Sequence, residues 1–216
     1  MEFSRLSFWK RLGWGLLALA LFVGTALGLF WVNKHYVHMT NVLLLTMLAD
    51  IVFFILMAWL FKWRRIRMGW HVKVDLFQIL KLLVFSALAA LIWEIFMNFF
   101  ITGEPRNQEV LLREAGKHSF WLFAVFAVGI APVVEEFLFR GILFNAFPRK
   151  WPTVALFGSS ALFGLFHGPE SINTFFLYAG LGVIFGTVYK ETRSLFFSVL
   201  AHGACNAMAL AALFLR

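Results

Sequence analysis

The sequence predicts an all-α, polytopic transmembrane helical bundle with about seven spans. Of the 216 residues, 62% are hydrophobic, and 28 are Phe and 9 are Trp. The mean hydropathy is +0.83. Several apolar runs reach about 20 residues, the length that an α-helix needs to cross a bilayer. This composition excludes a soluble globular domain.

Seven apolar runs are predicted to form the spans. They are residues 12–32, 42–61, 76–101, 120–147, 152–167, 172–189 and 195–215. The fourth run is longer than a simple span requires, so we expect it to tilt or to project from the membrane. The fifth run is short. The first exceeds the roughly 7–15 apolar residues of a signal peptide, so we expect a retained span.

The distribution of Lys and Arg predicts a cytoplasmic N-terminus, because cytoplasmic flanks carry the excess of basic residues. With that orientation, twelve basic residues flank the spans on the inner side: Arg5, Lys10, Arg11, Lys62, Arg64, Arg65, Arg67, Lys73, Arg149, Lys150, Lys190 and Arg193. Five flank them on the outer side: Lys34, Arg106, Arg113, Lys117 and Arg216. The net charge of +8 is therefore assigned to topology and lipid headgroups, and no nucleic-acid partner is expected.

The longest connection outside the predicted spans is residues 102–119. Its second half is predicted to form a short amphipathic helix at the outer interface. Gly168 and Pro169 end the fifth run, and the turn over 168–171 is predicted to dip into the protein. Cys205 is the only cysteine, so no disulfide can form within the chain.

Two adjacent carboxylates and a guanidinium lie inside the fourth apolar run: Glu135, Glu136 and Arg140. Charge in hydrocarbon is costly, so ionisable residues there indicate a functional site. Glu136 and Arg140 are four residues apart, which favours an ion pair on one helix face. Glu135 is rotated by about 100° from Glu136. It therefore remains available for proton chemistry, although a purely structural ion-pair network is the alternative interpretation.

Further polar groups occur in the fifth and seventh runs. Phe163 and His167 are four residues apart at the end of the fifth run, and His202 and Asn206 are four residues apart in the seventh. The four-residue spacing places His202 and Asn206 on one helix face. Together with a free glutamate, such groups can hold a water, polarise it and stabilise an oxyanion, as acyl-transfer hydrolysis requires.

These three motifs, in this order and on successive membrane helices, resemble those of the CPBP family, the CAAX-protease and bacteriocin-processing (Abi) membrane proteins. The resemblance covers about residues 120–215. It divides the chain into three N-terminal spans with the outer connection, residues 1–118, and a CAAX-protease-like helical core of four spans, residues 119–216. The chain is most similar to bacterial members, which places it in the plasma membrane as a multi-pass protein.

The resemblance implies an intramembrane glutamic endopeptidase acting on a membrane-associated peptide or protein, with no cofactor. Carried over by position, Glu135 and His167 would activate the attacking water. His202 and Asn206 would stabilise the tetrahedral oxyanion. Glu136 and Arg140 would form the supporting pair. The motifs do not specify a cleavage site.

Four other classes of protein remain open. A zinc protease could use Glu135, His167 and His202 as ligands, although no H-E-x-x-H motif occurs. A serine protease using Ser159 or Ser160 is weaker, because small residues in spans usually serve close helix packing. A non-catalytic interaction or bacteriocin-immunity protein could keep the same fold. A transporter would use polar residues of the second and third runs, namely Asp50, Lys81, Glu94 and Asn98, but the repeated halves typical of transporters are missing.

Overall fold

The computed structural model describes residues 3–35, 39–63, 76–101 and 120–213, and all regular structure within these ranges is helical. Each predicted run is a helix, or a continuous series of helical segments in the case of the fourth. The bounds are η1 Phe3–Arg5, α1 Phe8–His35, α2 Met39–Trp63, α3 Leu76–Asn98, α5 Phe120–Val125, η2 Phe126–Ile130, α6 Ala131–Glu136, η3 Phe137–Phe144, α7 Pro152–Phe166, α8 Ile172–Thr192 and α9 Leu195–Leu213. The interfacial helix predicted between 102 and 119 lies outside the described residues.

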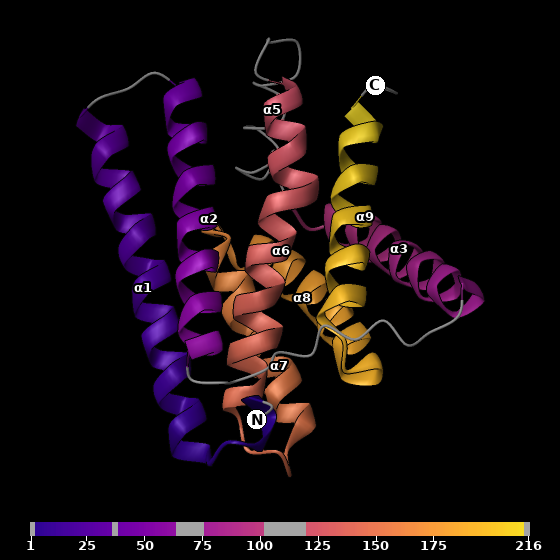
Figure 1. The fold of residues 1–216 in the computed structure, drawn as a ribbon. Coiled ribbons are helices and arrows are strands. Elements are labelled where there is room, and N and C mark those ends of the chain that lie inside the picture. Colours follow the sequence, from indigo (N-terminus) through magenta and orange to yellow (C-terminus); the bar gives the residue numbers. More distant parts are fainter. Residues whose placement is uncertain (1–2, 36–38, 64–75, 102–119, 214–216) are drawn as a thin grey trace.

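The series α5–η2–α6–η3 forms the central rod of the bundle (Figure 1). The paired helices α1 and α2 lie on one flank of this rod, and α9 lies on the other. Helix α3 packs on α8 and α9 and runs at a steep angle to the other long helices. Helix η1 and the C-terminal end of α9 lie at opposite ends of the bundle (Figure 1).

Five described helices are long and apolar enough to cross a membrane. These are Leu44–Lys62, Phe77–Asn98, Phe120–Phe144, Ile172–Thr192 and Leu195–Ala212. The short fifth run is α7, an apolar helix of 15 residues. The predicted class, a polytopic helical membrane protein, is confirmed by these helices.

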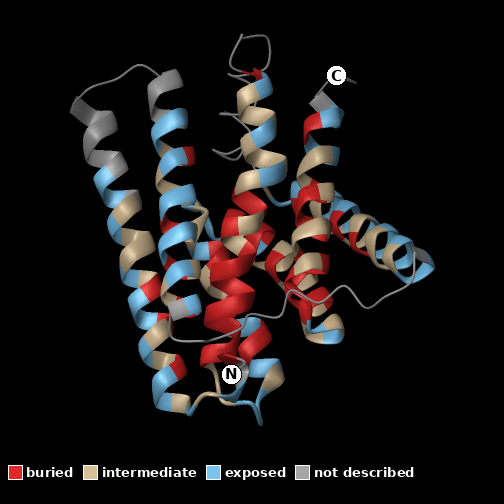
Figure 2. Ribbon diagram, viewed as in Figure 1, coloured by how far each residue is buried: buried red, intermediate tan, exposed pale blue. Residues whose placement is uncertain are grey.

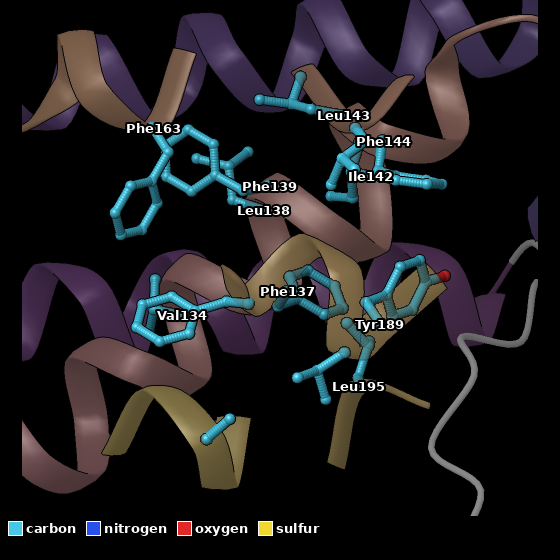
Figure 3. Packing of buried hydrophobic residues seen from close by; sticks show 14 of the residues in the cluster. Val134, Phe137, Leu138, Phe139, Ile142, Leu143, Phe144, Phe163, Tyr189 and Leu195 are labelled. Carbon is cyan, nitrogen blue, oxygen red and sulfur yellow. The ribbon is translucent and has the colours of Figure 1, made fainter. Parts of the chain in front are cut away.

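Buried residues gather in one half of the bundle, around α6 and η3 (Figure 2). Every residue of η3 is buried, and aromatic side chains from neighbouring helices pack against it. Phe139 and Phe163, for example, meet edge to face with centroids 5.2 Å apart (Figure 3). By contrast, α2 and α3 expose many large apolar side chains, as lipid-facing helices do. The polar motifs therefore lie in the part of the molecule with the densest packing.

Small residues allow α7 and α8 to approach closely. A Cβ on Gly182 would lie 3.1 Å from both Cα and Cβ of Ser160. A Cβ on Gly164 would lie 3.0 Å from the backbone nitrogen of Ala179. Because a Cβ at either position would lie closer to the neighbouring helix than ordinary van der Waals contact, this crossing resembles the small-residue contacts of membrane helices. It fixes the position of α8 relative to α7.

The turn between α7 and α8 corrects one prediction. Gly168 has a φ of +61°, a conformation that glycine adopts without strain, and it ends α7. Ser171 then caps α8 in a reciprocal pair of hydrogen bonds with Thr174. Gly168, Glu170 and Ser171 are exposed, so the prediction that this turn dips into the protein is wrong. The sharp ending of α7 does keep His167 beside the central rod.

Candidate active site

The central rod departs from α-helical geometry on both sides of the two glutamates. The segments η2 and η3 are π-helical, and α6 between them carries Glu135 and Glu136. Pro132 contributes to this irregularity, because it has no N–H to donate to a carbonyl of the preceding turn. Ala131 already donates its N–H to Phe126, five residues earlier. π-Helical turns are frequent at functional sites, and no sequence pattern used above predicted these two.

Glu136 and Arg140 form the predicted ion pair. Arg140 Nε lies 3.1 Å from Glu136 Oε2, and both side chains are fully buried. Arg140 also donates from Nη2 to the carbonyl of Gly182 at 2.6 Å, and its guanidinium carbon lies 4.8 Å from the ring centroid of Phe163. An apolar site accepts such charges only when they are paired and hydrogen-bonded.

Glu136 has two further partners, both on α9. Ser198 donates to Oε2 at 2.5 Å, and His202 Nδ1 lies 3.0 Å from Oε1. A carboxylate beside Nδ1 makes that nitrogen the donor, which leaves Nε2 of a neutral ring as an acceptor. The predicted supporting role of Glu136 therefore includes the orientation of His202.

Glu135 is directed away from this ion pair. Its side chain is 22% exposed, and its Oε2 lies 3.9 Å from Nε2 of His167 and 3.9 Å from Nε2 of His202. That oxygen makes no hydrogen bond to another group in the described part of the chain. Two histidines from separate motifs thus converge on one carboxylate oxygen of the glutamate from a third motif.

The two histidines present the same nitrogen to Glu135. His167 Nδ1 lies 2.8 Å from the carbonyl of Phe163, so it donates there and leaves Nε2 directed at Glu135. His202 does the same through Glu136. The tautomer of each ring follows from the bond at Nδ1. The four-residue spacing of Phe163 and His167 thus has a physical reason in this chain, because the carbonyl of residue 163 accepts the hydrogen bond from residue 167.

Asn206 lies one helical turn further along α9. Its amide donates to the carbonyl of Ala127 at 2.7 Å, and no described contact joins it to Glu135. A Cβ on Gly203 would lie 2.7 Å from the carbonyl oxygen of Val128, so glycine is required for α9 to approach η2. The contact with Ala127 uses one amide hydrogen of Asn206 and leaves the second hydrogen for another acceptor. Its oxyanion role stays a prediction.

The distances from Glu135 Oε2 to the two Nε2 atoms, 3.9 Å each, bear on both the water and the zinc alternatives. Zinc bound tetrahedrally at about 2.0–2.2 Å holds its ligand atoms about 3.4 Å apart. A water at about 2.8 Å from each atom is compatible with the observed 3.9 Å separations. Within the described ranges, no group of three His, Cys, Asp or Glu side chains has the geometry of a metal site.

The residues of the serine-protease alternative lie in the helix packing. Ser159 donates to the carbonyl of Leu156 at 3.2 Å, and Ser160 packs against Gly182. Both serines are buried. Cys205 is also buried and free. These observations support the packing interpretation for all three side chains.

Sequence reasoning missed two partners of the ion pair. Ser198 precedes His202 by four residues, so the spacing that joined His202 to Asn206 could also have found Ser198 on the same face of α9. The carbonyl of Gly182 had no comparable signal, because a backbone acceptor 42 residues away is identified only by the fold.

Comparison with known proteins agrees with the motifs. Residues 117–208 match the family model described as type II CAAX prenyl endopeptidase Rce1-like. The predicted CPBP resemblance is confirmed. All six predicted site residues lie in the matched segment of this CPBP-like chain. The UPF0177 protein YbdI of Lactococcus lactis subsp. lactis (strain IL1403) is 32% identical over 90 residues. That alignment covers 42% of this chain and 48% of the relative, so the chain spans about half the length of the relative. No solved structure matches.

Proposed function

We propose that this protein is an intramembrane endopeptidase that hydrolyses peptide bonds of membrane-associated peptides or proteins. The observation that carries the proposal is the convergence of two histidine Nε2 atoms on Oε2 of Glu135, at 3.9 Å each. The match of residues 117–208 to the Rce1-like family supports this class of activity. The active site would lie within the plasma membrane, with the N-terminus in the cytoplasm.

The first step is attack by water. A water between Glu135 Oε2 and His167 Nε2 has an acceptor on each side, so both of its hydrogens can be bound. Glu135 takes one proton while the water oxygen bonds to the scissile carbonyl carbon. The carbonyl oxygen becomes the oxyanion of a tetrahedral intermediate. The neutral tautomer of His167, set by the Phe163 carbonyl, keeps its acceptor directed at this water.

The second step is collapse of the intermediate. Glu135 returns its proton to the leaving nitrogen, the C–N bond breaks, and the products are a carboxylic acid and an amine. In the form that carries a proton on both nitrogens, His202 would donate from Nε2 to the oxyanion while its Nδ1 lies 3.0 Å from Glu136 Oε1. With Glu135 ionised and His202 protonated, the charges of Glu135, Glu136, Arg140 and His202 sum to zero. A neutral cluster is the least costly arrangement in an apolar surrounding.

The test is proteolysis of a membrane-peptide library by the purified protein in liposomes. Glu135→Gln keeps the shape of the side chain and removes the base, so we expect a folded protein with turnover reduced about 10²–10⁴-fold. Glu170→Gln is the matched control, because Glu170 is exposed on the turn after α7, and it should cleave like the wild type.

Three results would change the proposal. Full turnover by Glu135→Gln would refute the role of Glu135. Cleavage abolished by a chelator and restored by zinc would establish the metal-dependent alternative. Absence of cleavage by the wild type over the whole library would favour the non-catalytic interaction or immunity protein.

A further inference from the structure

Two aromatic rings on α8 each lie flat on one of the two histidines. Tyr178 stacks on His167 with centroids 4.5 Å apart and an interplanar angle of 21°. Phe185 stacks on His202 at 4.4 Å and 16°. Tyr178 and Phe185 are seven residues apart, which places them two turns apart on the same face of a helix. One face of α8 thus supplies an aromatic surface to both histidines.

Phe163 completes this arrangement from α7. Its ring centroid lies 4.3 Å from that of His167 and 5.6 Å from that of His202. Each imidazole therefore contacts two aromatic rings. One is the ring on α8 that stacks on it, and the other is Phe163, which contacts both histidines. Tyr178 and Phe185 are themselves 9% and 1% exposed, so neither ring can turn without displacing its neighbours.

These ring contacts restrict a rotation of the imidazole rings that the hydrogen bonds still permit. A single bond at Nδ1 fixes the tautomer but permits the ring to pivot about the axis through that nitrogen. A ring stacked on the flat face of the imidazole removes this freedom, because pivoting would break the face-to-face contact. With both constraints, Nε2 has one direction, and in both histidines that direction is towards Glu135 Oε2.

We propose that Tyr178 and Phe185 are positioning residues for the two active-site histidines, Tyr178 for His167 and Phe185 for His202. The inference rests on the proposed function, since it assigns them to the proposed hydrolytic site. Neither side chain takes part in proton transfer. Each holds the imidazole plane at the angle from which Nε2 reaches the water or the oxyanion.

The first experiment needs no substrate. The protein is labelled with ¹⁵N-histidine in nanodiscs, and the signals of His167 and His202 are assigned with His167→Asn and His202→Asn. Tyr178→Leu should shift and broaden the His167 ring signals and leave those of His202 in place. Phe185→Leu should do the reverse. Phe176→Leu is the matched control, because it makes the same change on the same helix at a side chain that is 49% exposed.

The second experiment measures cleavage of a substrate that the wild type accepts. Tyr178→Leu and Phe185→Leu should each lower kcat on the order of 10- to 100-fold with little change in KM, as displaced supporting groups do. Tyr178→Phe keeps the ring face and should rescue the activity lost in Tyr178→Leu.

Two outcomes would overturn the inference. One is unchanged histidine signals in both leucine variants, and the other is an equal disturbance by Phe176→Leu. These outcomes are separate from failure of the proposed function. If Glu135→Gln retained turnover while the leucine variants moved their own histidine signals, the positioning would stand and the hydrolytic role of Glu135 would fall.

Discussion

The side-chain amide of Asn206 donates a 2.7 Å hydrogen bond to the backbone carbonyl of Ala127, 79 residues earlier in the chain. Ala127 lies five residues before Pro132, which is the π-helical spacing that Ala131 and Phe126 already follow. Because Pro132 has no N–H, it cannot satisfy that carbonyl. Asn206 therefore supplies from α9 a donor that the central helix lacks.

This relationship predicts energetic coupling between positions 132 and 206. Asn206→Ala should reduce the free energy of unfolding by about 1–3 kcal/mol, because it leaves a partly buried carbonyl without a donor. In a Pro132→Ala background a backbone N–H becomes available, and the same change should cost less. We expect a coupling energy on the order of 1 kcal/mol in a double-mutant cycle, measured by denaturation in detergent.

Asn173→Ala is the control for this cycle. Asn173 also donates to a carbonyl on another helix, that of Phe100 at 2.7 Å, but the bond is exposed and has no proline beside it. Asn173→Ala should lower the free energy of unfolding by the same amount in the wild-type and Pro132→Ala backgrounds. Equal costs of Asn206→Ala in the two backgrounds would contradict the role of the proline.

The buried ion pair makes a prediction about stability. Arg140→Ala leaves Glu136 buried without its cation. We therefore expect the free energy of unfolding to fall by about 3–5 kcal/mol and the activity to be lost. The double change Arg140→Met with Glu136→Gln removes both charges and should recover much of that stability but none of the activity. Thermal unfolding followed by circular dichroism measures both.

The control is Lys190→Ala, which breaks the exposed pair with Glu191 and should cost roughly 0–1 kcal/mol. Equal losses in the two single variants would contradict this account of the buried pair.

Arg11 ties α1 to the end of η3. Its Nη1 donates to the carbonyls of Asn145 at 2.5 Å and Phe147 at 3.0 Å, and its side chain is buried. Arg11→Met keeps the apolar stem and removes both hydrogen bonds. We therefore expect the free energy of unfolding to fall by at most about 1.5–3 kcal/mol for each charged hydrogen bond removed. Lys10→Met changes the neighbouring exposed cation and should leave the unfolding midpoint nearly unchanged. A similar shift in both variants would assign the effect to net charge.

The close crossing of α7 and α8 predicts opposite effects for two glycine substitutions. Gly182→Ala places a Cβ 3.1 Å from Ser160, so overpacking should cost about 1–3 kcal/mol. Gly24→Ala meets nothing within 4 Å on α1 and should be neutral or stabilising by up to about 1 kcal/mol through helix propensity. Comparison of the two unfolding midpoints in the same detergent checks the difference. A stable Gly182→Ala protein would show that the crossing can relax.

The sequence alone determined the features that depend on local spacing. Hydrophobic run lengths predicted seven helical elements because each span must satisfy its backbone within itself. The spacing of Glu136 and Arg140 predicted their ion pair, and the same spacing put His202 and Asn206 on one face, because residues four apart are neighbours on any α-helix. The order of the three motifs was sufficient to indicate the resemblance to the CPBP family.

Only the tertiary structure decided which partner each polar group takes. Glu136 meets Ser198 and His202 across 62 and 66 residues, and Asn206 meets a carbonyl freed by Pro132 across 79. The rings of Tyr178 and Phe185 likewise meet the two histidines only because α8 packs against the helices that carry them. Helical periodicity sets the direction of a side chain from its own axis. What lies in that direction depends on how distant helices cross, and that is fixed by the packing of the whole bundle.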